Sequence, residues 1–503
     1  MLYDGHAPPG STGATSEWKW NISGAPDAWP QLVDAWNNRP DSYEDSTFDH
    51  FAFQMLGQQS ESRGCDSIGS KACGGDFSDV CGRSNPGSDA APPAAAVILT
   101  SLSAINQVFS SPKYALDYAR TLMEGTLQTV AAKFSPPEDD STEQAAEILG
   151  LLAGALPFAS ASALSSGLGK LWKIAADKQS IAAFREVAAK GVDLTAKVLD
   201  AAKPTQDPSE MHDNLESVLG AMYRKLADAQ TISLRDLMAM NGSDPDIQHV
   251  MGGLLSTGAL LNTWRTNANF TDELVTQHMQ MMYGQLIQST WALSTQDLRP
   301  FILRVDKNQR RCGDEFPPLD SLGIHLAPDA ASKALWCDPS GYSWYLLNGY
   351  HKTPSGPVRS HSTDDHHTFE MLPGRSIDVL TGESDAWAGL QLKDIIVSAY
   401  TGFEQNGNRN GYNATVTSSL VANDDMTTTS AEDGLPMQGG VRSPGFFRIT
   451  ICLDYNEAID SLSDPADRPI CGISPVTIPT TGGEGTAAPN LGLGAVLAGI
   501  PAL

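Results

Sequence analysis

The densest group of potential metal ligands in this sequence lies between residues 361 and 370. His361, His366 and His367 precede Glu370, and imidazole and carboxylate groups hold Zn²⁺ or Cu²⁺ in many proteins. The spacing of these histidines matches no common metalloenzyme motif, and HExxH is absent. The neighbouring residues have the polar composition of a solvated loop. We therefore expect a surface loop here, and we predict neither a metal centre nor a cofactor.

A second polar motif, Asn406-Gly-Asn-Arg-Asn-Gly411, has the alternating oxygen-bearing side chains and the sixth-position glycine of a calcium loop. An asparagine replaces the usual first aspartate, and Thr417 stands where a bidentate glutamate closes such a site. Neutral side-chain oxygens remain, and both Asn and Gly tolerate positive φ. The motif therefore favours a turn.

No other pattern of reactive residues identifies an active site. The sequence contains no GxSxG nucleophile elbow and no Walker phosphate loop. A glycosidase needs two facing carboxylates, but nothing in the sequence selects a pair among 59 acidic residues. Four early tryptophans are large enough to stack on sugar rings: Trp18, Trp20, Trp29 and Trp36. The favoured alternative is that they clamp the N-terminal segment onto the core, so no catalytic residue is predicted.

The cysteines indicate the cellular compartment. Seven are present: Cys65, Cys73, Cys81, Cys312, Cys337, Cys452 and Cys471. None forms the CxxC pair typical of zinc sites, so disulfides formed in an oxidising compartment are the better interpretation. The economical pairings join Cys312 to Cys337 and Cys452 to Cys471. One of the three early cysteines is then left free or bonded to another chain.

Glycosylation sequons and the chain ends add little to this assignment. Asn21, Asn241, Asn269 and Asn413 each begin an Asn-x-Ser/Thr motif, but a chain rich in Ser and Thr contains such motifs by chance. The first residues lack the basic start and apolar core of a signal peptide. Residues 481–503 are a Gly/Ala-rich tail, which is either a flexible surface tail, the favoured interpretation, or a glycolipid-anchor signal.

Length and charge limit the classes of function. A chain of 503 residues exceeds one ordinary domain, and a hydrophobic content of 41% is typical of globular proteins. The formal net charge of −26 opposes binding to phosphate backbones and to anionic lipid headgroups. Nucleic acid is therefore excluded as a partner.

The hydrophobic pattern divides the chain into four parts. Residues 1–90 predict an irregular Cys/Trp-containing wrapping segment, and residues 91–299 predict a bundle of six or more helices. Residues 300–480 mix strand and helix patterns and predict a small disulfide-bearing α+β module. The Gly/Ala-rich tail follows. The predicted fold class is mainly α.

Individual elements are clearest where apolar spacing and capping residues agree. A helix is expected over 211–228, behind an N-cap at Asp207 and a proline at Pro208. Apolar residues recur along it at helical spacing: Met211, Leu215, Val218, Met222 and Leu226. The same pattern predicts helices over 271–287 and 390–400, and strands over 342–347 and 446–452.

Two uncharged runs, residues 90–112 and 148–169, are each long enough to span a bilayer. One interpretation makes them central bundle helices packed by the helices around 211–228 and 271–287. The other makes them a conditionally exposed hairpin, as in helical pore-forming toxins. We favour the bundle, because small residues and Pro157 weaken membrane insertion and the net charge opposes adsorption to anionic lipid.

The order of these features resembles a group of uncharacterised secreted fungal proteins. The resemblance rests on the acidic Trp-containing start at 25–29, the Gly-rich cysteine segment, the two apolar stretches and the later Cys337-Asp-Pro-Ser-Gly-Tyr-Ser-Trp-Tyr345. Some of these proteins are similar to parts of killer-toxin-associated chitinase polypeptides outside the chitinase domain. The resemblance is one of layout, and the third early cysteine and the longer polar loops depart from it. It implies a secreted fungal protein and transfers no catalytic residue.

Together these observations predict a secreted or cell-wall-associated, non-enzymatic scaffold or interaction protein. Two alternatives stay open: a membrane-active, toxin-like helical protein, and a carbohydrate-active enzyme on extracellular polysaccharide. The expected partners are a wall polysaccharide or a membrane, and a second chain bonded through an unpaired cysteine.

Overall fold

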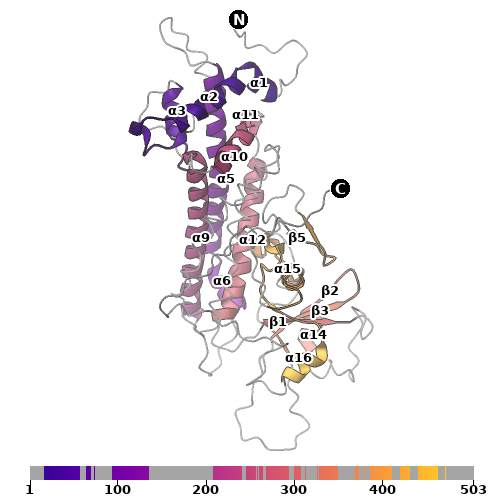
Figure 1. Ribbon diagram of the computed structural model, residues 1–503. Coiled ribbons are helices and arrows are strands. Elements are labelled where there is room, and N and C mark those ends of the chain that lie inside the picture. Colours follow the sequence, from indigo (N-terminus) through magenta and orange to yellow (C-terminus); the bar gives the residue numbers. More distant parts are fainter. Residues whose placement is uncertain are drawn as a thin grey trace, which may run out of the picture.

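The computed structural model describes the chain in separate stretches. These are residues 16–56, 64–68, 73, 93–134, 208–240, 245–255, 258, 260–263, 268–293, 300–306, 312, 326, 328–348, 369–372, 380, 386–410, 420–430, 440–462 and 471. Helices predominate within them, and a small sheet stands beside the lower end of the helices in Figure 1. The described part of the chain is thus mainly α, with a smaller α+β part after residue 300.

The described part of the N-terminal segment is helical, although an irregular segment is predicted there. Its elements are α1 (Ser16–Ile22), α2 (Ala25–Asn37), the 3-10 turn η1 (Asp41–Tyr43) and α3 (Phe48–Met55). The buried face of α2 carries Ala25, Trp29, Leu32 and Trp36 at spacings of four, three and four. Gly24, with a φ of 80°, and Pro40 stand at the joints between short helices. The prediction of an irregular segment rested on the composition of residues 1–90 as a whole, which does not reveal the helical spacing of the apolar residues in α2.

Within the described residues, three long helices form the bundle: α5 (Pro93–Glu124), α9 (Pro208–Ala239) and α12 (Ala268–Leu293). They run side by side and pack on one another (Figure 1). Shorter helices follow their ends: α6 (Leu127–Phe134), α10 (Pro245–Leu255) and α11 (Leu260–Thr263). The two helices predicted in this region are confirmed, and α9 begins at Pro208 as its capping residues predict.

Two hydrophobic clusters lie along the bundle. The N-terminal cluster joins α1, α2, α3, α10 and α11 to the first half of α5 and the end of α9. The central cluster joins α6, α12 and the α+β part to the second half of α5 and the start of α9. The helices α5 and α9 have 32 residues each and pass through both clusters. At 1.5 Å per residue each is about 48 Å long.

The first uncharged run lies in α5 and is buried. Leu102 is fully enclosed in the N-terminal cluster, where it is grouped with Leu234 and Met238 from the end of α9 rather than with residues 211–228. The expected packing by residues 211–228 was wrong because α5 and α9 are antiparallel, so the start of one lies beside the end of the other. The expected packing by the helix over 271–287 agrees with the contact between α5 and α12. By length and composition α5 is apolar enough to cross a membrane, but 72% of its most apolar window is buried, as in core helices of soluble proteins. The second run, 148–169, lies outside the described residues.

The main sheet has the strand order β2-β3-β1-β7, with β4 also paired to β3. Its strands are β1 (Pro300–Val305), β2 (Leu335–Cys337), β3 (Ser343–Asn348), β4 (Glu370–Met371) and β7 (Thr450–Cys452). β1 is antiparallel to β3 and parallel to β7. A separate hairpin consists of β5 (Leu420–Ala422) and β6 (Thr428–Ser430).

The remaining elements of the α+β part are α14 (Pro328–Lys333), η4 (Trp387–Gly389), α15 (Leu392–Gln405), η5 (Gly440–Arg442) and α16 (Tyr455–Leu462). The predicted strand over 342–347 and the helix over 390–400 are confirmed. The strand predicted over 446–452 is shorter and begins at Thr450. Phe446 and Phe447 instead pack on α12 at Gly284, where an added Cβ would lie 3.0 and 3.1 Å from their rings.

Both faces of the sheet are covered. Along β3, Trp344 and Leu346 belong to the central cluster, whereas Tyr345 and Leu347 belong to a third cluster with residues of α14 and α16. This alternation follows from the two-residue period of a strand. The bundle and the α+β part therefore share one hydrophobic cluster.

Three disulfides are present: Cys65–Cys73, Cys312–Cys337 and Cys452–Cys471. The second and third are the pairings that the sequence separations favour. Cys65 and Cys73 are buried in the N-terminal cluster. Cys81 lies outside the described residues.

Candidate functional site

The early tryptophans pack inward, as the favoured interpretation predicts. Trp20, Trp29 and Trp36 are buried in the N-terminal cluster, and the indole N–H of Trp36 donates a hydrogen bond of 2.6 Å to the carbonyl of Met240. Trp18 is the exception, with 37% of its surface exposed. Three of the four rings are therefore unavailable for stacking on a sugar.

The calcium-like motif acts as a turn in its described part. The Asn410 amide accepts a hydrogen bond of 2.8 Å from the backbone N–H of Ile451 and donates one of 3.1 Å to its carbonyl. Asn406 is the C-cap of α15, and its side-chain amide donates a hydrogen bond of 2.8 Å to the carbonyl of Arg409. Both amides are thus used to hold the chain, and the interpretation as a turn is confirmed for residues 406–410.

The histidine cluster at 361–367 lies outside the described residues. Glu370 lies in β4, but its side chain is not among those that the structure describes.

A buried carboxyl group lies beside the first disulfide. Asp49, on α3, is fully enclosed, and it accepts a hydrogen bond from the backbone N–H of Cys65. Burial raises the pKa of this carboxyl, while hydrogen bonds from Thr47 and Cys65 oppose the rise. A side chain at position 64 would crowd this carboxyl group, because a Cβ added to Gly64 would lie 3.3 Å from Asp49 and 3.0 Å from Asp66. Because solvent cannot reach Asp49, its role is to hold the Cys65 loop rather than to transfer a proton to a substrate.

An ion-pair network joins α15, η5 and the β5–β6 hairpin. Arg442 lies 2.7 Å from the buried carboxylate of Asp394 and 2.8 Å from Asp424, and Lys393 lies 2.8 Å from Asp424. Burial raises the pKa of Asp394, and the Arg442 charge opposes that rise. Every charged group in this network has an opposite partner, so the network links the three elements and offers no free group for chemistry.

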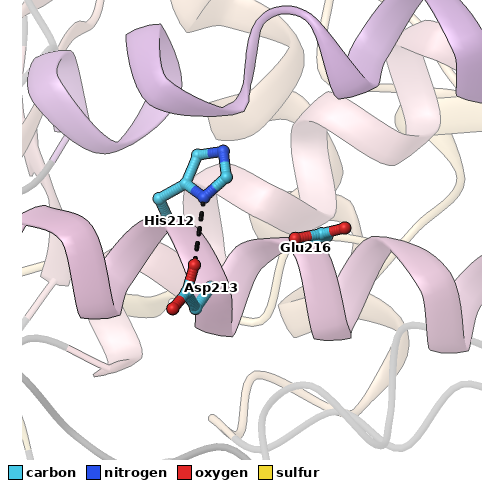
Figure 2. A group of neighbouring side chains, drawn as sticks. All are labelled: His212, Asp213 and Glu216. Carbon is cyan, nitrogen blue, oxygen red and sulfur yellow. Dashed lines mark hydrogen bonds and ion pairs between the residues drawn. The ribbon is translucent and has the colours of Figure 1, made fainter.

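A group of possible metal ligands lies on α9: His212, Asp213 and Glu216 (Figure 2). Each offers one ligand atom, and these atoms lie within 4.8 Å of one another. His212 Nδ1 is 3.3 Å from Asp213 Oδ1, and Glu216 is one helical turn further along. The imidazole is partly enclosed, whereas both carboxylates are exposed.

This group was not predicted from the sequence, although the sequence carries a signal for it. The capping residues place the helix start at Pro208, so His212 and Glu216 are i and i+4 within a well-predicted helix and must share a face. The density of histidines, which is highest at 361–367, does not reveal such spacing within a helix.

The glycosylation sites remain predictions. Asn21 is exposed on α1. Asn269 lies on α12, although its side chain is not described, and Asn241 and Asn413 lie outside the described residues.

Comparisons with known proteins give one distant relative. No family model matches the chain, and no solved structure matches it. The chain is 23% identical over 472 residues to the "Secreted chitinase LysM12" of Penicillium expansum. The aligned region covers 86% of this chain but 29% of that protein's length. The chain is thus distantly similar to part of a secreted, chitinase-related fungal protein.

Proposed function

We propose that this chain is an extracellular, non-enzymatic scaffold that binds polysaccharide of the fungal cell wall. The observation that carries the scaffold role is the pair of helices α5 and α9, which pass through both hydrophobic clusters of the bundle. Helices buried along about 48 Å make a stiff support, because bending them would open both clusters at once.

An extracellular location is supported by two independent observations. The chain has three disulfides. Disulfides persist in oxidising compartments and are rare in the cytosol. The distant relative is a secreted protein.

The stiff bundle presents an exposed row of apolar side chains. Tyr114, Tyr118 and Leu122 lie four residues apart on α5 and are 59%, 56% and 40% exposed. Successive members are about 6 Å apart along the helix, so the two phenol rings follow one another on one face. We name Tyr114, Tyr118 and Leu122 the exposed row.

Wall polysaccharide is the partner whose chemistry fits this surface best. Tyrosine rings present an apolar body and a hydroxyl group, and sugar rings have apolar faces edged by hydroxyls. A neutral polysaccharide is not repelled by a chain of net charge −26, whereas an anionic membrane is. The chitinase-related relative also points to a polysaccharide rather than to a membrane.

Co-sedimentation with insoluble chitin and with insoluble β-glucan tests the proposal. We expect the full chain to sediment with at least one of them. The variant Tyr114→Ala/Tyr118→Ala should bind at least tenfold more weakly, a loss of about 1.4 kcal/mol or more. Met55→Ala is the matched control, because Met55 is 53% exposed but lies on α3. Circular dichroism checks that each variant is folded.

An assay for released sugars runs in parallel. A non-enzymatic scaffold releases no soluble sugar from either polysaccharide. Turnover by the purified chain that is lost on heat denaturation would replace the scaffold with a carbohydrate-active enzyme. Binding to neither polymer, or equal binding by the double tyrosine variant, would reject the exposed row as the contact surface.

A further inference from the structure

We propose that His212, Asp213 and Glu216 bind a divalent transition-metal ion, with Zn²⁺ the best-fitting ion. This site is separate from the exposed row and does not depend on polysaccharide binding. We name these three residues the α9 triad.

The geometry of the α9 triad is close to that of a zinc site. Two ligand atoms that each lie about 2.0–2.1 Å from a tetrahedral Zn²⁺ are about 3.3 Å apart. His212 Nδ1 and Asp213 Oδ1 already have this separation, at 3.3 Å. All three ligand atoms lie within 4.8 Å, so Glu216 needs a rotation of its exposed side chain and no movement of the backbone.

The charges around the α9 triad favour a cation. Asp213 and Glu216 are i and i+3 on one helix, so their negative charges repel each other. Glu216 has no basic partner among the residues that the structure describes, and Asp213 pairs there with His212. A bound divalent ion would neutralise both carboxylates, and the net charge of −26 raises the local concentration of cations.

The ligand types select the class of ion. Imidazole suits Zn²⁺, Cu²⁺ and Ni²⁺, whereas Ca²⁺ and Mg²⁺ prefer oxygen ligands alone. Three protein ligands leave a fourth tetrahedral position, which water or a group from a bound partner would fill. The imidazole is the most enclosed of the three groups and would anchor the ion.

Titration with ZnCl₂ tests the proposal, provided that the other histidine cluster is removed first. The background variant is full-length chain carrying His361→Asn, His366→Asn and His367→Asn, freed of metal by a chelator. Isothermal titration calorimetry on this background should show one bound Zn²⁺ per chain. Adding His212→Asn or Glu216→Gln should weaken the affinity by about tenfold or more.

A matched control separates ligation from a general loss of charge. Asp228→Asn removes one exposed carboxylate from the same helix, about 18 Å from Glu216 along its axis, and should leave the affinity within about twofold. CoCl₂ provides a second readout, because four-coordinate Co²⁺ absorbs strongly in the visible range and this band should be lost in His212→Asn.

Glu216 and Asp228 are exposed and His212 is partly exposed, so substitution of any of the three should leave the thermal unfolding midpoint at that of the background in metal-free buffer. The proposal is wrong if the background binds no Zn²⁺. Equal affinity and equal Co²⁺ absorption in the His212→Asn and Glu216→Gln variants would also overturn it.

Discussion

A histidine buried in the bundle makes the stability of the protein depend on pH. His278, on α12, is fully buried, and its Nδ1 lies 2.6 Å from the carbonyl of Leu274. Its Nε2 has no hydrogen-bond partner within the described part of the chain. Burial lowers the pKa of His278 to about 4, against an ordinary value of 6.5. The folded protein therefore holds this imidazole neutral in mildly acidic solution.

We predict that His278 makes the protein less stable in acid. Its pKa is depressed in the folded state, so between pH 6.5 and about 4 the unfolded chain binds a proton that the folded chain does not. The contribution of this group is complete above pH 6.5 and is lost as the pH falls towards 4, by roughly 3 kcal/mol in total. Urea unfolding at several pH values measures the loss, and His278→Leu should remove it.

A second histidine provides the control for this prediction. His50→Gln also removes one imidazole, but from a half-buried position on α3. The acid-dependent loss should persist in this variant. Identical pH profiles for the wild type and His278→Leu would show that His278 is not the group responsible.

At the scale of elements, the question is whether α5 is a core helix or a latent membrane helix. Leu102 lies in its uncharged first half and is fully enclosed. We predict that Leu102→Asp prevents folding, because an unpaired buried carboxylate costs several kcal/mol. Soluble yield and thermal unfolding measure the effect. Tyr118→Asp, on the exposed side of the same helix, should fold normally.

Liposomes test the membrane alternative directly. The wild-type chain should release no dye from vesicles, since most of the apolar surface of α5 is occupied by its neighbours. Dye release by the wild type that disappears in a still-folded Leu102→Asp variant would instead establish the toxin-like role.

At the scale of the whole molecule, two disulfides bond strands of the main sheet to cysteines 25 and 19 residues away in the sequence. Cys452 lies in β7 and is bonded to Cys471, and Cys337 lies in β2 and is bonded to Cys312. Peptide mapping under non-reducing conditions should find both pairs and Cys65–Cys73. Closing loops of 25 and 19 residues removes denatured-state entropy worth about 3 kcal/mol each, so reduction should lower the thermal unfolding midpoint. Free thiols at these positions in the purified protein would also remove the main support for secretion.

Local patterns were sufficient to predict several elements. The capped start of α9 at Pro208, the helix over 271–287 and the strand over 342–347 all follow from residues close together in the chain. Apolar periodicity and capping act over a few residues, so they can be read without knowing the fold. The same is true of His212 and Glu216, whose shared face follows from helix geometry alone.

The tertiary structure decided which surfaces face one another. The antiparallel course of α5 and α9 gave Leu102 neighbours from the end of α9, which no local pattern specifies. Packing against Gly284 took Phe446 and Phe447 out of the predicted strand, because a buried contact outweighs weak strand propensity. Burial of the early tryptophans and of His278 likewise depends on elements distant in sequence. The sequence by itself determined the local elements and their charge, whereas long-range packing set the burial on which each side chain's chemistry depends.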